Sequence, residues 1–107
     1  MPGNSHPLEN PLAVRELGVT DSDEKVLVQL GHPISIGGEE VRCPYRISYR
    51  GECHGLDVCA VDAFQALQLA LRVIPVELRY RTNLPVGRMY WLEPGDDMGF
   101  LEQGGGS

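Results

Sequence analysis

Residues 60–75 read AVDAFQALQLALRVIP, and this stretch decides the fold because it predicts a helix that is apolar nearly all round. Asp62 stands before the first helical residue and Gln65 follows three positions later, which is the spacing of a capping box with aspartate as the cap. We expect both residues to have this structural role. Within the helix only Gln65, Gln68 and Arg72 are polar, and they share one narrow stripe. The apolar arc is then roughly twice the ~100° of an ordinary surface helix, which is more than one face of a sheet covers.

The residues after Pro75 fit two interpretations. Val76, Leu78 and Tyr80 alternate as in a strand, whereas Ile74 and Leu78 keep the spacing of a helix. A proline inside a helical pattern ends the helix or kinks it. We expect a kinked helix that continues beyond the proline, and the alternative is a strand.

The stretch before the helix, residues 41–58, reads VRCPYRISYRGECHGLDV and predicts a β-hairpin that turns at Arg50-Gly51. The expected pairs are Tyr49 with Glu52 and Cys43 with Val58. Pro44 indicates an edge position or a bulge. The expected inner face holds Val41, Cys43, Tyr45, Ile47, Leu56 and Val58. The expected outer face holds Arg42, Arg46, Ser48, Arg50, Cys53 and Asp57.

That outer face is locally basic in an acidic protein. One interpretation is a solvated sheet face with weak cross-strand ion pairs. The other is a contact surface, because arginine is enriched where proteins bind each other. The candidate protein-binding residues are therefore Arg42, Arg46, Arg50 and Asp57.

The order of elements predicts an α+β fold, with an antiparallel sheet of four to five strands and one long helix packed on one face. The helix lies between the hairpin and the last strand. The other strands are expected at residues 12–19, 25–30 and 88–92, with a short bridge at Ile34 and Ile36. The spare flank of the helix is expected to be covered by the loop 31–40, by a second copy of the chain, or by the C-terminal residues Tyr90, Trp91, Met98 and Phe100.

Composition and length predict one folded domain of 107 residues with a net charge of −6. This charge argues against nucleic acid or an anionic membrane as a partner, and it permits a basic protein. Residues 1–11 are expected to be a flexible arm, 12–101 one α+β domain, and 102–107 a flexible tail that resembles a linker. An odd number of cysteines and the lack of a signal-peptide pattern favour a cytoplasmic location.

The segments CPYRI (43–47), GLDVCAVDAFQALQLAL (55–71) and GF (99–100) together resemble a family of small, uncharacterised bacterial domains. Its pattern is a Cys-x-Tyr strand followed by an Asp-x-x-Gln-Ala-Leu helix. The matching residues are Cys43, Tyr45, Asp62, Gln65, Ala66, Leu67, Ala70, Leu71, Gly99 and Phe100. The resemblance implies a stand-alone bacterial domain without known catalytic residues. Such domains often lie beside toxin genes as immunity partners.

Cys43, Cys53, His54 and Cys59 are the candidate metal ligands and nucleophiles. Their spacing lacks the tight pairs of a zinc site, and the hairpin places Cys43 and His54 on one face and the other two on the opposite face. A cysteine–histidine pair needs its side chains side by side, which adjacent residues on a strand do not achieve. The helix start favours a reactive thiol at Cys59, but we expect a thiol without a catalytic role. We expect no catalytic residue, no metal and no cofactor.

Three functions follow as hypotheses. The first is a non-enzymatic protein-binding domain, most plausibly an immunity or antitoxin-type inhibitor of a bacterial toxin encoded nearby, whose acidic loops meet a basic partner. The second is a small-molecule-binding or enzymatic domain with a pocket between helix and sheet, and with Tyr45, His54 or Cys59 at its rim. The third is a structural homodimer joined through the helix flank or an edge strand.

Overall fold

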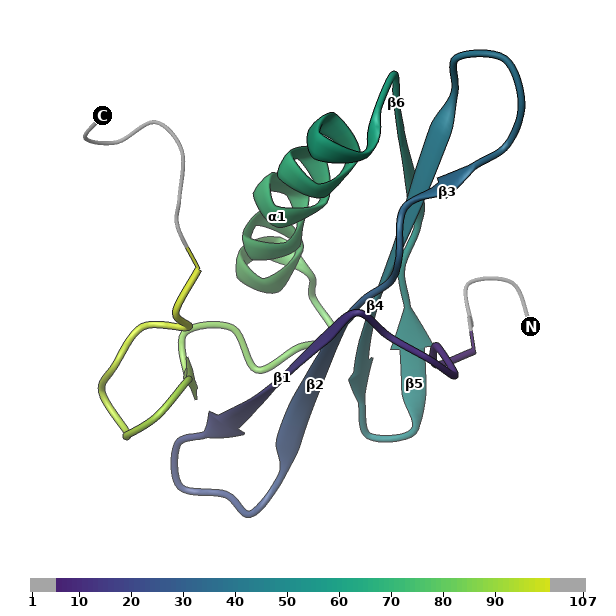
Figure 1. Ribbon diagram of the computed structural model, residues 1–107. Coiled ribbons are helices and arrows are strands. Elements are labelled where there is room, and N and C mark those ends of the chain that lie inside the picture. Colours follow the sequence, from purple (N-terminus) through teal and green to yellow (C-terminus); the bar gives the residue numbers. More distant parts are fainter. Residues whose placement is uncertain (1–5, 101–107) are drawn as a thin grey trace.

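An antiparallel sheet carries one long helix on one of its faces (Figure 1). The structure is a computed structural model that describes residues 6–100. The elements in chain order are β1 (Ala13–Val19), β2 (Lys25–Leu30), β3 (Ile34–Ser35), β4 (Val41–Tyr49), β5 (Glu52–His54), β6 (Asp57–Ala60), α1 (Ala63–Tyr80) and β7 (Met89–Tyr90). This arrangement confirms the predicted α+β class and the place of the helix between the hairpin and the last strand. No helix in residues 6–100 is long and apolar enough to cross a membrane.

Strand β4 is the centre of the sheet because it has partners along both edges. Its residues 45–48 pair with β2, and residues 47–49 pair with β5. Nearer its start it pairs with β3 and β6. Beyond β2 the sheet continues with β1 and ends with β7. All of these pairings are antiparallel.

The register of the hairpin is the predicted one. Tyr49 lies opposite Glu52, and Cys43 lies opposite Val58. The turn residues both have positive φ, 52° at Arg50 and 79° at Gly51, as in the tight turns whose twist matches a hairpin. The prediction that Leu56 faces inward is wrong. The chain leaves the ladder between β5 and β6, and the side chain of Leu56 is 63% exposed.

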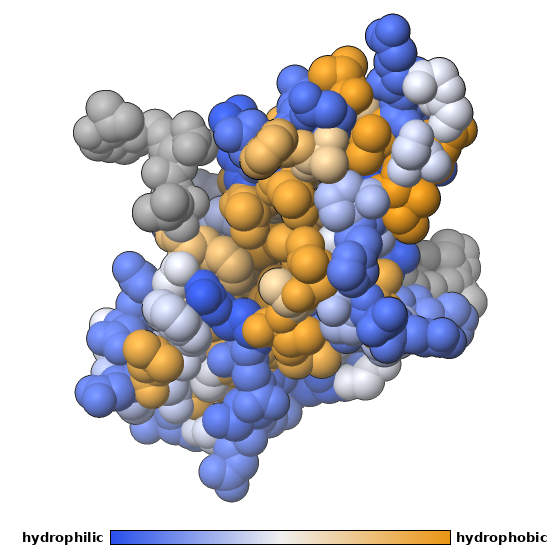
Figure 2. Space-filling view, in the orientation of Figure 1, coloured by the Kyte–Doolittle hydropathy of each residue, from blue (hydrophilic) through white to orange (hydrophobic). Residues whose placement is uncertain are grey.

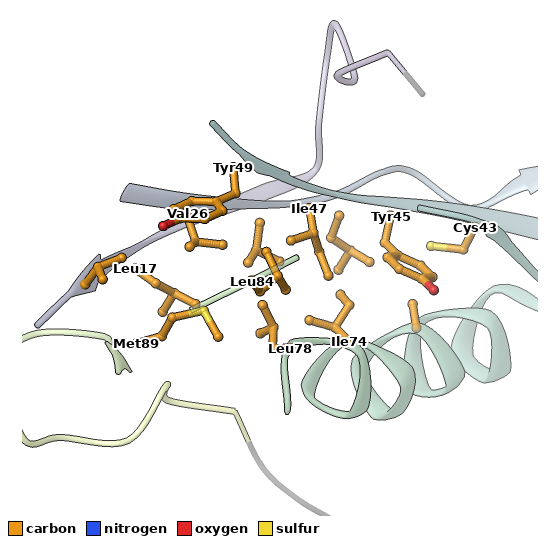
Figure 3. Close-up of a cluster of buried hydrophobic side chains, with 14 of the residues drawn as sticks. Leu17, Val26, Cys43, Tyr45, Ile47, Tyr49, Ile74, Leu78, Leu84 and Met89 are labelled. Carbon is orange, nitrogen blue, oxygen red and sulfur yellow. The ribbon is translucent and has the colours of Figure 1, made fainter. Parts of the chain in front are cut away.

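Helix α1 runs through Pro75 to Tyr80, which confirms the helical interpretation of this segment. Besides Pro75, its buried residues are spaced four apart and form one stripe, and the helix packs on β4 and β6. Ile74 and Leu78 of this stripe are labelled in Figure 3. Two residues of the stripe are alanines, so the first half of the helix lies close to the sheet. The stripe is Ala66, Ala70, Ile74 and Leu78.

The core lies between this stripe and the inner face of the sheet. Tyr45 is completely buried beneath the helix, and its hydroxyl donates a hydrogen bond of 3.0 Å to Glu77 Oε2. Burial first, and then this hydrogen bond, raise the pKa of Tyr45 far above its usual value. Other apolar side chains of the same core cluster that are labelled in Figure 3 include Leu17, Val26, Ile47, Ile74, Leu78 and Met89.

The last strand is shorter than predicted. Only Met89 and Tyr90 of the expected range 88–92 form a strand, and they pair with the end of β1. The ring of Tyr90 lies over Gly18, where an added Cβ would collide with it. After Tyr90 the chain leaves the sheet, because residue 91 packs on an arginine of β1 instead of extending the strand.

The N-terminal segment that the structure describes, residues 6–10, reaches the outer face of the sheet. The backbone N–H of Leu8 donates to Gln29 Oε1 at 2.9 Å, and its carbonyl accepts from Gln29 Nε2 at 3.2 Å. The flexibility of residues 1–11 stays a prediction. Residues 1–5 and the predicted tail 102–107 lie outside the described residues.

Candidate functional site: a groove beside helix α1

An open groove of about 440 Å³ lies between α1 and the strands β1 and β2. It exists because the helix packs on β4 and β6 and leaves the inner face of β1 and β2 partly uncovered. In Figure 2 the apolar residues gather in a hollowed band between the helix and the sheet, with hydrophilic residues around it. The apolar walls are formed by Val28, Leu30, Leu71, Ile74 and Phe100.

Arg15 stands at one end of the groove and holds the C-terminal segment. It occupies an inward position of β1, in line with the buried Leu17 and Val19. Its guanidinium lies between two rings, 3.8 Å from the centroid of Trp91 and 4.8 Å from that of Phe100. Such cation–π contacts favour a fixed geometry.

The same guanidinium also binds backbone. Arg15 Nη1 donates to the carbonyl of Gly99 at 2.7 Å and lies 3.5 Å from that of Met98. Glycine is needed at position 99, where φ is 81° and an added Cβ would collide with the ring of Trp91. We call Arg15, Trp91, Gly99 and Phe100 the arginine clasp. The clasp bounds the groove with the C-terminal segment, and Phe100 is the residue of the predicted C-terminal covering that lines the groove beside the helix.

The polar lining of the groove is cationic. Arg72 of α1 is exposed, and its side chain makes no hydrogen bond or ion pair with any residue between 6 and 100. Among the described lining residues, Gln68 has the only uncharged polar side chain, and none is acidic. Two arginines therefore line an apolar groove in a chain whose net charge is −6. The positive charge of these two arginines favours an anionic group on a partner that binds in the groove.

The apolar surface continues along the helix beyond the groove. Leu71 is 45% exposed and Phe64 is 81% exposed. They are seven positions apart, which corresponds to about 10 Å along a helix axis. The loop 31–40, which was predicted as another covering, contributes no residue to the groove. The flank is thus only partly covered within the described chain.

The predicted arginine surface is divided by local contacts. Arg46 Nη1 lies 3.7 Å from Asp57 Oδ1, and Arg46 Nε donates to the carbonyl of His6 at 3.1 Å. Arg50 lies in the hairpin turn and binds Glu24. Arg42 is exposed on β4, four residues or roughly 13 Å from Arg46. The structure therefore joins Arg46 to Asp57 but does not gather the three arginines into one cluster, and their role in binding stays a prediction.

Glu24 links two turns at the end of the sheet. Its Oε2 accepts a 2.6 Å hydrogen bond from Arg50 Nε, and its Oε1 accepts bonds of 3.0 Å from Arg50 Nη2 and 2.9 Å from the Tyr49 hydroxyl. The hydrogen bond from Arg50, followed by that from Tyr49, lowers the pKa of Glu24 below its usual value. This cluster fixes turn geometry.

Replacing Glu24 with glutamine is expected to weaken the pH dependence of stability in acid. Because the folded pKa of Glu24 is lowered, its stabilisation is present above the unfolded pKa and is lost as pH falls through the folded pKa. Urea unfolding between neutral pH and about pH 3 measures this, with Glu39→Gln in the exposed 31–40 loop as the control. Equal pH dependence in Glu24→Gln and the wild type would contradict the prediction.

Asp62 and Gln65 lie at the start of α1 as a cap. Asp62 Oδ1 accepts from the backbone N–H of Gln65 at 2.8 Å. Gln65 Oε1 accepts from the backbone N–H of Val61 at 3.0 Å, one residue before the position of an ordinary capping box. Both contacts position the helix and neither faces the groove.

The cysteines differ in accessibility. Cys43 is completely buried, its Sγ lies 3.4 Å from the carbonyl of Gly31, and burial followed by the charge of Asp57 raises the pKa of this thiol. Cys53 is also buried, whereas Cys59 is exposed. Within residues 6–100 no three His, Cys, Asp or Glu side chains come together as metal ligands would.

Only Cys59 is expected to react with Ellman's reagent in the folded protein, because a thiol must be accessible and ionised to react. Absorbance should show one rapidly reacting thiol per chain under native conditions and three in guanidinium. The variant Cys59→Ser should lack the rapid phase. A rapid phase that survives in this variant would show that a buried thiol is accessible.

The pocket that the sequence predicted is placed differently. Tyr45, His54 and Cys59 were expected at its rim, and none of them lines the groove. His54 Nε2 lies instead 3.4 Å from Glu52 Oε1, near the hairpin turn. Sequence analysis missed Arg15, although a charged residue at an inward position of a strand was a usable signal.

Comparisons with curated proteins and with solved structures find no match. The Cys-x-Tyr strand and the Asp-x-x-Gln-Ala-Leu helix predicted that the chain belongs to an uncharacterised family of small domains. A match to such a family confirms this part of the prediction. The bacterial source and the cytoplasmic location stay predictions. A family model matches residues 13–101, and the chain therefore belongs to the family described as Domain of unknown function (DUF6968).

Proposed function

We propose that this protein is a non-enzymatic protein-binding domain that holds its partner at the groove and at the exposed flank of α1 beside it. The supporting observation is the open apolar groove, whose surface continues over Leu71 to Phe64. Contiguous exposed apolar surface on a folded domain marks interaction sites. A partner that fills the groove and covers Phe64 would remove this surface from water.

Two features favour a protein partner over a substrate. A small molecule seated in the groove would leave Phe64 exposed, whereas a protein surface reaches both. In addition, the described lining holds no histidine, cysteine, serine, threonine or carboxylate. These are the side chains that usually transfer protons or attack a substrate, so the groove lacks the ordinary means of acid–base or nucleophilic catalysis.

The more specific form of the proposal is an immunity or antitoxin-type inhibitor whose partner is a toxin encoded nearby. Its support is the resemblance of the sequence and the acidic character of the chain. Negative charge outside the groove would steer a basic toxin toward the surface. The apolar groove would then provide the contact that holds the complex.

Co-expression with the product of the neighbouring gene tests the proposal. We expect a one-to-one complex by native mass spectrometry, and Leu71→Asp should raise its Kd about tenfold or more. Val76→Asp is the matched control, since Val76 lies on the same helix, is 54% exposed and does not line the groove. Protection of cells from the neighbouring gene product would support the inhibitor form.

Other outcomes would replace the proposal. If both aspartate variants bind as the wild type does, the contact surface lies elsewhere. If the chain sediments as a dimer at micromolar concentration and Leu71→Asp makes it a monomer, the groove joins two copies and the structural-homodimer hypothesis takes its place.

A further inference from the structure

We infer that the groove takes an apolar segment of the partner that carries a carboxylate, and that Arg72 is the residue that pairs with this carboxylate. The inference rests on the proposed function and specifies the chemistry of the partner. It follows from the charge of the groove, from its apolar walls and from the length of the exposed surface.

The charged side chains in the described lining of the groove are all positive. The Arg72 side chain has no hydrogen-bond or ion-pair partner among the described residues, and none of the described lining residues is acidic. Arg15, which also lines the groove, uses only Nη1 for hydrogen bonds to residues 98 and 99, which leaves Nε and Nη2 without a hydrogen-bond partner in the described chain. Guanidinium groups bind carboxylates through paired, charge-assisted hydrogen bonds. A segment bearing lysine or arginine would instead meet two like charges, which disfavours it.

The walls between the two arginines select apolar side chains. Val28 and Leu30 form the floor on β2, while Leu71 and Ile74 form the helix side. Filling this space with apolar groups removes both surfaces from water. A fully charged segment would lose its hydration over these walls without gaining partners. The segment must therefore combine apolar side chains with a carboxylate at the edge.

The length of the surface indicates a peptide segment. From Phe64 to Arg72 the helix spans eight residues, or about 12 Å. An extended segment of about four residues covers this distance, and so do about two turns of a helix. The carboxylate would lie at the Arg72 end and an apolar side chain would lie over Phe64.

Peptide display on the whole chain tests this inference. A library of random peptides of about twelve residues is selected on the wild type, and the enriched peptides are then tested for binding to Leu71→Asp. We expect enriched peptides to contain apolar residues and at least one aspartate or glutamate. In a synthetic copy, replacement of that acid by its amide should raise Kd about tenfold.

Variants at two arginines locate the carboxylate. Arg72→Gln should raise the Kd of the selected peptide about tenfold, and Arg72→Glu should raise it further. Arg42→Gln and Arg42→Glu are matched controls, since the Arg42 side chain is also exposed and makes no hydrogen bond or ion pair with the described residues, but it lies outside the groove. They should leave Kd unchanged.

The outcomes separate this inference from the proposed function. Peptides that bind through Leu71 but ignore the Arg72 variants, or that are rich in lysine and arginine, would overturn the inference and leave the groove as a binding surface. A library that yields no peptide, while the co-expressed complex still depends on Leu71, would overturn it as well. Peptides that ignore Leu71→Asp and respond to the Arg42 variants would overturn both and favour the outer arginine surface.

Discussion

Replacing Leu78 with alanine is expected to lower the free energy of unfolding by roughly 2–5 kcal/mol. The side chain is completely buried and lies in Figure 3 among Ile74, Leu84 and Met89. Its removal loses apolar transfer energy and leaves a cavity. The last turns of the helix have one backbone hydrogen bond fewer, because Pro75 lacks the N–H that would bond to the carbonyl four residues earlier. Packing of Leu78 therefore holds the last turns of α1.

Val76→Ala is the control for this prediction. Val76 lies in the same segment but is 54% exposed, so its truncation should change stability by only about 0.5 kcal/mol. Urea unfolding followed by circular dichroism measures both variants. If the two variants lose the same free energy, the last turns are held by local helix propensity and not by packing.

The helical structure of residues 76–80 shows how far periodicity predicts secondary structure in this fold. The alternation Val76, Leu78, Tyr80 and the helical spacing of Ile74 and Leu78 were both present, and the helical interpretation was correct. Tertiary packing decided between them, because Ile74 and Leu78 are both needed on the same side to fill the core. A pattern alone contains no information about which neighbour is available.

The hairpin was predicted in register because its turn and its alternation agree. The error at Leu56 arose because alternation was extended across Gly55, where the chain departs from the ladder between β5 and β6. The last strand was overestimated for a similar reason. Trp91 continues an aromatic run in sequence, but its ring packs on Arg15, which is 76 positions away and outside any local window.

The candidate site was beyond the reach of sequence patterns. Alternation along β4 identified an outer face with Arg42 and Arg46, but it does not say that Asp57 and the carbonyl of His6 occupy Arg46. The groove depends on where α1 lies across the sheet. What the sequence did predict is that the helix has more apolar surface than one sheet face covers. In the structure, the apolar helix surface that the sheet leaves uncovered includes the exposed Leu71 and the groove beside it.

The arginine clasp connects this site to the fold. Arg15 interrupts the apolar inner face of β1 and so limits the core at this end of the sheet. The same side chain draws residues 91–100 across that end through two ring contacts and the carbonyl of Gly99. The groove is thus bounded by a contact between segments far apart in sequence, and its shape depends on that contact remaining closed.

The second large effect is expected at Gly55, where Gly55→Ala should cost about 3 kcal/mol of stability. A Cβ at this position would collide with the carbonyl oxygen of Tyr45 and approach the Cα of Arg46. Both obstacles are backbone of the central strand, so neither moves aside as a side chain does. Any displacement of the backbone that relieves this collision would strain the hydrogen bond of 3.0 Å from the Tyr45 N–H to the carbonyl of Leu56.

Gly38→Ala separates this collision from the general cost of replacing glycine. Gly38 has a φ of 58° and no atom within 4 Å of an added Cβ, so its replacement should cost only about 1 kcal/mol through backbone strain. Hydrogen exchange gives the local readout. In Gly55→Ala, protection should fall at Tyr45 and along β5 and β6, because the collision separates these strands from β4. If Gly55→Ala is as stable as Gly38→Ala and equally protected from hydrogen exchange, the backbone of β4 moves to accommodate the added Cβ. The helix stripe packed on β4 would then rest on a more deformable strand than the burial of Tyr45 indicates.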